Sequence, residues 1–152
     1  MVRLTKIDEY LPLTKRFSGR IGIMTATKTV LVVDDAAEIR DLLADLILRP
    51  SGYNVLTAAS GAQGLDLART HSPDIVISDI KMPDLTGIEL TQLLKREKPS
   101  LPVILITAEG SEEVARQALR ICADDYFPQP FDPDEMLETL ERPTREPSRQ
   151  SP

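Results

Sequence analysis

The chain has 152 residues and a net charge of −6, which suits one soluble domain with short tails. A single cysteine and a single histidine exclude an internal disulfide and a metal centre rich in either residue. No apolar run approaches the roughly 18 residues of a membrane-spanning helix or resembles a signal peptide, so we expect a cytoplasmic protein without membrane contact.

Residues 1–27 lack a regular pattern. Their apolar side chains fall near helical spacing, but Pro12 and Gly19 interrupt them. We expect a weakly structured N-terminal extension, or alternatively a mis-annotated start upstream of a natural start at Met24. The charge changes sign after this segment, from +3 over residues 1–26 to −10 over residues 27–140. An acidic domain suits a cation or a basic partner protein, and we expect no direct DNA binding.

Residues 28–141 alternate between two periodicities and form the predicted domain. Short β-branched apolar runs, typical of strands covered on both faces, alternate with segments whose apolar residues recur at helical spacing. The predicted strands are 29–33, 53–58, 74–78, 102–106 and 124–127. The predicted helices are 35–49, 60–71, a segment after Gly87 through about residue 98, 111–123, and one opened by Asp132. This order predicts an α/β fold, a doubly wound parallel sheet between two helix layers.

Residues 142–152 contain three prolines and no large apolar side chain, so we expect a disordered tail. Since this tail is too short for a DNA-binding module, we expect a stand-alone domain.

Carboxylates follow two of the predicted strands. Asp34 and Asp35 follow the first strand, Asp79 follows the third, and Thr107 follows the fourth. Ligands of open parallel sheets bind outside the carboxyl ends of the strands, and neighbouring strands lie about 5 Å apart. Two charges about 4 Å apart repel by roughly 4 kcal/mol at an effective dielectric constant near 20, so such a cluster calls for a cation such as Mg²⁺.

Such a site is suited to phosphoryl transfer to an aspartate. A metal neutralises the phosphoryl oxygens while the carboxylate attacks, and the Thr107 hydroxyl could bond one of those oxygens. Each residue could also have a purely structural role. Asp34 or Asp35 would then cap the next helix, Asp79 would form a turn, and Thr107 would pack at a strand end.

Four segments together resemble the receiver domain of two-component response regulators. They are VLVVDD (30–35), DIVISDIKMPDLTG (74–87), ILITA (104–108) and ADDYFPQPF (123–131). The resemblance covers about residues 28–141. It implies a flavodoxin-like fold of five parallel strands in the order 2-1-3-4-5 with five helices.

The resemblance also implies a role for each matching residue. Asp79 matches the phosphate-accepting aspartate, and the other matches are Asp34, Asp35 and the Lys81 backbone carbonyl as Mg²⁺ ligands with Asp79, and Thr107 and Tyr126 as switch residues. The implied donor is a sensor histidine kinase or phosphotransfer protein. An unknown downstream protein, or a second copy in a homodimer, would bind the face of the fourth helix, fifth strand and fifth helix.

One position departs from the family pattern. The family places a lysine before the final proline, whereas this chain has Gln129 before Pro130, in a peptide bond that the motif implies is cis. A glutamine can donate a hydrogen bond but carries no charge, so phosphorylation should depend more strongly on Mg²⁺.

Three functions remain open at this point. The first is a phosphoacceptor signalling domain, which is not an enzyme although self-phosphorylation and dephosphorylation belong to the family. The second is a receiver-like binding module that no longer switches by phosphate because of Gln129. The third is a Mg²⁺-dependent phosphatase, against which the adjacent aspartate pair and the lack of room for a cap domain both argue.

Overall fold

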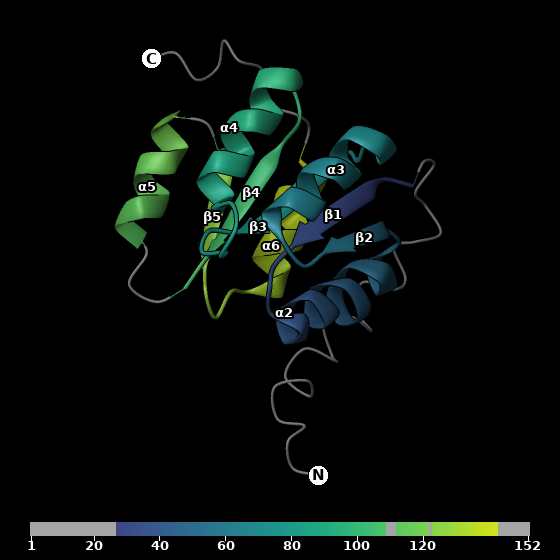
Figure 1. Cartoon of the computed structure of the whole chain (residues 1–152). Helices are drawn as coiled ribbons and strands as arrows, with labels where there is room; N and C mark the ends of the chain where they lie inside the picture. The colour runs from purple at the N-terminus through teal and green to yellow at the C-terminus, as the bar shows by residue number, and fades with distance from the viewer. Residues whose placement is uncertain (1–26, 109–111, 122, 143–152) are drawn as a thin grey trace.

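The computed structural model describes residues 27–108, 112–121 and 123–142 (Figure 1). The predicted N-terminal extension, apart from Thr27, and the predicted tail, apart from Arg142, lie outside the described residues. Within them, five strands form one parallel sheet in the order β2-β1-β3-β4-β5. This order confirms the predicted fold class.

The strands begin or end close to the predicted residues. They are β1 (Thr29–Val33), β2 (Asn54–Ala58), β3 (Ile75–Asp79), β4 (Val103–Thr107) and β5 (Asp125–Pro128). The last three each end one residue later than the apolar pattern predicts, because Asp79 pairs with Ile106 and Thr107 pairs with Pro128 in the sheet. Asp79 and Thr107 are therefore the last residues of their strands.

Five helical segments connect and follow these strands in the described part of the chain. Four of them are α3 (Gly61–His71), α4 (Gly87–Glu97), α5 (Glu112–Ile121) and α6 (Pro133–Glu141). The first segment differs from the single α-helix predicted over residues 35–49. It consists of α2 (Ala37–Asp41), a π-helical stretch η3 (Leu42–Leu48) and a 3₁₀ turn η4 (Arg49–Ser51). Pro50 is accommodated within that 3₁₀ turn, and Gly52, with φ of 99°, ends the segment.

The sheet is covered on both faces because successive side chains of a strand point to opposite sides. Val30 and Val32 of β1 pack in one cluster with side chains of η3 and α6. Leu31 and Val33 pack in a second cluster with side chains of α4 and β2. Figure 1 accordingly shows α3 and α4 on one face of the sheet and α6 on the other.

Candidate metal centre

Three carboxylates meet at the carboxyl ends of β1 and β3. These strands are neighbours, with Val33 paired to Ser78, so the residues that follow this pair share one edge of the sheet. One carboxylate oxygen from each of Asp34, Asp35 and Asp79 lies within 4.8 Å of the other two. The sequence prediction that these side chains converge is confirmed.

Asp34 is the most deeply placed of the three, with 2% of its surface exposed. Its Oδ1 accepts a hydrogen bond from the backbone N–H of Ala36 at 2.9 Å, and Arg40 Nη1 donates to its backbone carbonyl oxygen at 2.8 Å. Its Oδ2 is buried and has no hydrogen-bond partner among the described residues. A buried carboxylate oxygen without a partner is costly, and a hard cation would satisfy it, so the donor set fits Mg²⁺.

The same crowding shifts the protonation of the cluster. Burial, with repulsion from Asp79 and Asp35, raises the pKa of Asp34 to about 6, against the opposing effects of the Ala36 amide and Arg40. Burial also raises the pKa of Asp79, with a further contribution from Asp35, while the backbone N–H groups of Ile80 and Lys81 favour the ionised form. The site is therefore short of positive charge without a cation.

The loop after Asp79 is held close to the strand end. The backbone N–H of Gly87 donates to the Ile80 carbonyl oxygen at 2.8 Å, and a Cβ at Gly87 would lie 2.2 Å from the Asp79 carbonyl oxygen. Only glycine fits this approach. Further along the loop, both Asp84 carboxylate oxygens accept hydrogen bonds from the first two amides of α3, at Gly61 and Ala62. The loop is thus fastened to the neighbouring helix.

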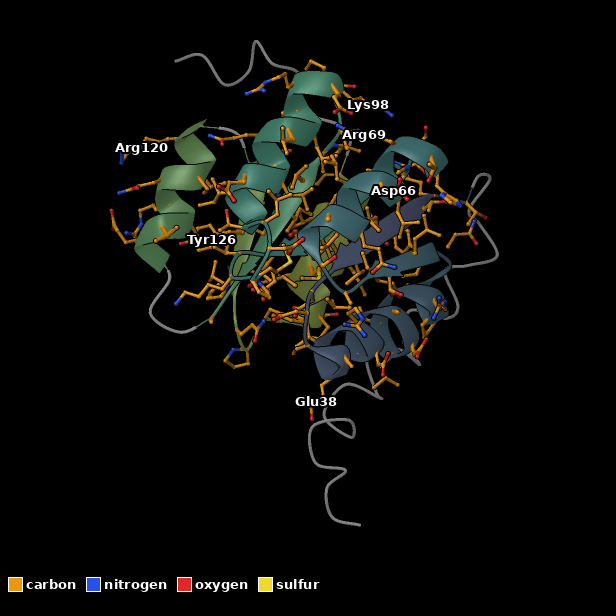
Figure 2. All side chains as sticks on the ribbon, viewed as in Figure 1. Glu38, Asp66, Arg69, Lys98, Arg120 and Tyr126 are labelled. Atoms are coloured by element: carbon orange, nitrogen blue, oxygen red, sulfur yellow. The ribbon has the colours of Figure 1, made fainter. Side chains whose placement is uncertain are left out.

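The other predicted site residues follow β4 and β5. Thr107 is fully buried, and its hydroxyl has no hydrogen-bond partner among the described residues. The backbone N–H of Gln129 donates to the Thr107 carbonyl oxygen at 2.9 Å, and the Gln129–Pro130 peptide bond is cis, as the resemblance implies. Tyr126 pairs with Leu105 in the sheet (Figure 2). Its half-buried side chain packs against a buried cluster that includes Ala115 and Ala118 of α5.

Sequence reasoning missed two residues that support the site. Arg40 binds the backbone of Asp34, and Asp84 caps α3 from 22 residues away. No local pattern distinguishes either of them, because each acts on a backbone group brought near by the fold. The structural alternative that Asp34 or Asp35 caps the next helix is wrong, because α2 has no side-chain cap. The Asp34 carboxylate instead accepts a hydrogen bond from the backbone N–H of Ala36, which precedes the first turn of α2.

The fold and the strand-end carboxylates define an α/β domain of the receiver class. The chain belongs to the response regulator receiver domain family, whose sequence profile matches residues 30–141.

Individual relatives agree with this assignment. The chain is 38% identical to the polar-differentiation response regulator DivK of Brucella ovis, over 75% of this chain and 94% of DivK. It is also 38% identical to the phosphate regulon transcriptional regulatory protein PhoB of Pseudomonas aeruginosa, over 74% of this chain and 50% of PhoB. The structure of the chemotaxis protein CheY4 of Vibrio cholerae superposes with a TM-score of 0.70 at 34% identity, covering 77% of this chain and 98% of CheY4.

The chain spans about half the length of several curated transcriptional regulators that it matches. Within the part of the chain that the structure describes, no helix combines the length and the apolar character needed to cross a membrane.

Proposed function

We propose that this receiver domain accepts a phosphoryl group on Asp79 with the help of Mg²⁺. The observations that carry the proposal are the convergence of three carboxylates within 4.8 Å of one another and a buried oxygen of Asp34 that has no hydrogen-bond partner among the described residues. The buried Thr107 hydroxyl at the end of the next strand supports it as a group available to a phosphoryl oxygen.

In the proposed reaction, an Asp79 carboxylate oxygen attacks the phosphorus atom of a phosphohistidine. A new O–P bond forms, and the N–P bond of the donor breaks. Its electron pair stays on the imidazole nitrogen, which takes up a proton. The chain contributes the nucleophile, and the backbone N–H groups of Ile80 and Lys81 favour its ionised form. The domain is a phosphoacceptor rather than an enzyme in this proposal.

Asp34, Asp35 and Asp79 would hold the metal, together with the backbone carbonyl that the family resemblance assigns to Lys81. When bound, Mg²⁺ neutralises the negative charge of the transferring phosphoryl oxygens. The buried position of Asp34 suits it to direct metal contact, whereas the exposed Asp35 suits contact directly or through water.

Phosphorylation adds roughly 1.5 to 2 negative charges and would shift an existing two-state equilibrium of the domain. The donor in this proposal is a sensor histidine kinase or phosphotransfer protein. The surface that a downstream protein would bind comprises α5, β5 and α6, where Tyr126 lies half-buried (Figure 2).

The test is labelling of the purified chain with a small phosphodonor such as acetyl phosphate. We expect Mg²⁺-dependent addition of one phosphoryl group, detected by intact mass, and its loss in Asp79→Ala. Equal labelling of wild type and Asp79→Ala would refute the assignment of the phosphoacceptor.

Gln129 favours a second candidate, a binding module that does not switch by phosphate. Its side chain is uncharged and half-buried at the position where the family has a lysine. This candidate predicts Mg²⁺ binding without labelling, and one partner affinity in the presence and absence of phosphodonor.

A further inference from the structure

We propose that Asp84 sets the Mg²⁺ affinity of the metal centre by holding the β3–α4 loop, residues 80–86, against α3. Asp84 acts through the loop and is therefore a positioning residue rather than a metal ligand. The inference rests on the proposed function, because the affinity concerned is that of the three strand-end carboxylates. Three contacts of α3 support it.

The first contact joins the Asp84 carboxylate to the start of α3. One carboxylate oxygen accepts a hydrogen bond from the backbone N–H of Ala62 at 2.8 Å, and the other accepts from that of Gly61 at 3.1 Å. The hydrogen bond from Ala62, together with that from Gly61, lowers the pKa of Asp84, so the carboxylate is ionised at neutral pH. Its charge lies at the positive end of the helix, and two charge-assisted hydrogen bonds attach the loop to α3.

The second contact lies at the next residue of the loop. Leu85 is half-buried and packs against the buried cluster that contains Leu31 and Val33. The start of α3 approaches it so closely that a Cβ at Gly61 would lie 2.6 Å from the Leu85 Cβ. The loop therefore rests directly on the helix at the place where Asp84 binds it.

The third contact joins α3 to the other half of the metal centre. A Cβ at Gly64 would lie 2.8 Å from Cγ2 of Val33. Val33 is the last residue of β1 and directly precedes Asp34. One helix thus contacts the end of the strand that carries two of the carboxylates and, through Asp84, the loop that follows the third. Figure 1 shows α3 in this position over the sheet.

The loop is consequently held at its middle as well as near its ends. The backbone N–H of Gly87 donates to the Ile80 carbonyl oxygen at 2.8 Å, which closes the loop next to Asp79. A metal that needs ligands from both strand ends binds the docked loop, and its apparent Kd rises as the docked fraction falls. Loss of Asp84 should therefore weaken Mg²⁺ binding although no metal ligand is removed.

The experiment measures the Kd for Mg²⁺ by calorimetry and the stability of the metal-free chain by urea unfolding. Asp84→Asn keeps the shape but only one acceptor oxygen, and Asp84→Ala keeps neither. We expect the Kd to rise about threefold in Asp84→Asn and about tenfold in Asp84→Ala. The larger value is the lower end of the loss that follows mutation of groups that orient metal ligands.

The matched control is Ser60→Ala, because Ser60 caps the same helix without involving the loop. Its hydroxyl accepts a hydrogen bond from the backbone N–H of Gln63 at 3.1 Å. Ser60→Ala and Asp84→Ala should both lower the free energy of unfolding, but only Asp84→Ala should raise the Kd. In the metal-free chain, the amide hydrogen of Gly87 should also exchange faster in Asp84→Ala than in Ser60→Ala, since its hydrogen bond closes the loop.

Labelling with acetyl phosphate separates this inference from the proposed function. We expect Asp84→Ala to be labelled slowly at limiting Mg²⁺ and at the wild-type rate at saturating Mg²⁺, because only the affinity changes. Wild type that is labelled no better than Asp79→Ala would overturn the proposed function. Normal labelling of wild type would overturn the role of Asp84 alone if Asp84→Ala matched Ser60→Ala in Kd or in Gly87 exchange, or stayed slow at saturating Mg²⁺.

Discussion

Replacing Asp34 by asparagine should stabilise the metal-free domain, although it removes a proposed metal ligand. Burial and the neighbouring carboxylates raise the pKa of Asp34 from 3.8 to about 6. Since each pH unit between the folded and unfolded pKa values is worth about 1.4 kcal/mol, the ionised carboxylate costs the folded state about 3 kcal/mol. Asparagine keeps the shape and the acceptor for Ala36. We therefore expect a gain of about 1 to 3 kcal/mol in the free energy of unfolding near neutral pH.

The gain depends on pH with a defined sign. Between pH 3.8 and about 6 the folded state binds more protons than the unfolded state, so wild-type stability falls as the pH rises through this window. The advantage of Asp34→Asn should be complete above pH 6 and should vanish as the pH falls toward 4. Millimolar Mg²⁺ should reverse the order, because only wild type retains the full ligand set.

The assay is urea unfolding followed by circular dichroism, at about pH 4 and about pH 7.5, with and without Mg²⁺. The matched control is Asp41→Asn, because Asp41 is an exposed carboxylate on the helix that follows Asp34. An Asp34→Asn domain that is no more stable than wild type near pH 7.5 without metal would refute the electrostatic reasoning. A gain that persists unchanged near pH 4 would refute it as well.

Three further predictions follow from the same site. Mg²⁺ at ten times its Kd should stabilise the domain by about 1.4 kcal/mol, measured as a rise in melting temperature. The rise should be lost in Asp35→Asn, and an equal rise in that variant would contradict the metal site. Gly87→Ala should lower the free energy of unfolding by at least about 2 kcal/mol, because its Cβ would lie 2.2 Å from the Asp79 carbonyl oxygen; wild-type stability in urea would contradict the close approach. Thr107→Val should raise the free energy of unfolding by about 1 kcal/mol, because it removes a buried hydroxyl that has no hydrogen-bond partner among the described residues. The same variant should bind beryllofluoride, a stable mimic of a phosphoryl group, more weakly. A destabilised variant would show that the hydroxyl is hydrogen-bonded in solution.

The alternation of periodicities was sufficient to predict the sheet and its helix layers. A β-branched run such as 29–33 can be buried only between two layers, and the parallel order follows from the helices between the strands. The same local information misjudged the first helix, where the apolar spacing of residues 35–49 is equally compatible with α-helical and π-helical backbone hydrogen bonding. In the structure, η3 packs in one buried cluster with the sheet and α6.

The sequence by itself placed carboxylates at the carboxyl ends of two parallel strands. They converge because β1 and β3 are neighbours in the sheet, an order that the family resemblance implied and the structure confirms. Only the tertiary structure decided what each carboxylate does there. The structure buries Asp34 and leaves one of its oxygens without a partner among the described residues. It also brings the Arg40 guanidinium to the Asp34 backbone carbonyl and the Asp84 carboxylate to the backbone N–H of Ala62. These contacts involve backbone groups or residues distant in sequence, so a pattern of side chains along the chain does not predict them.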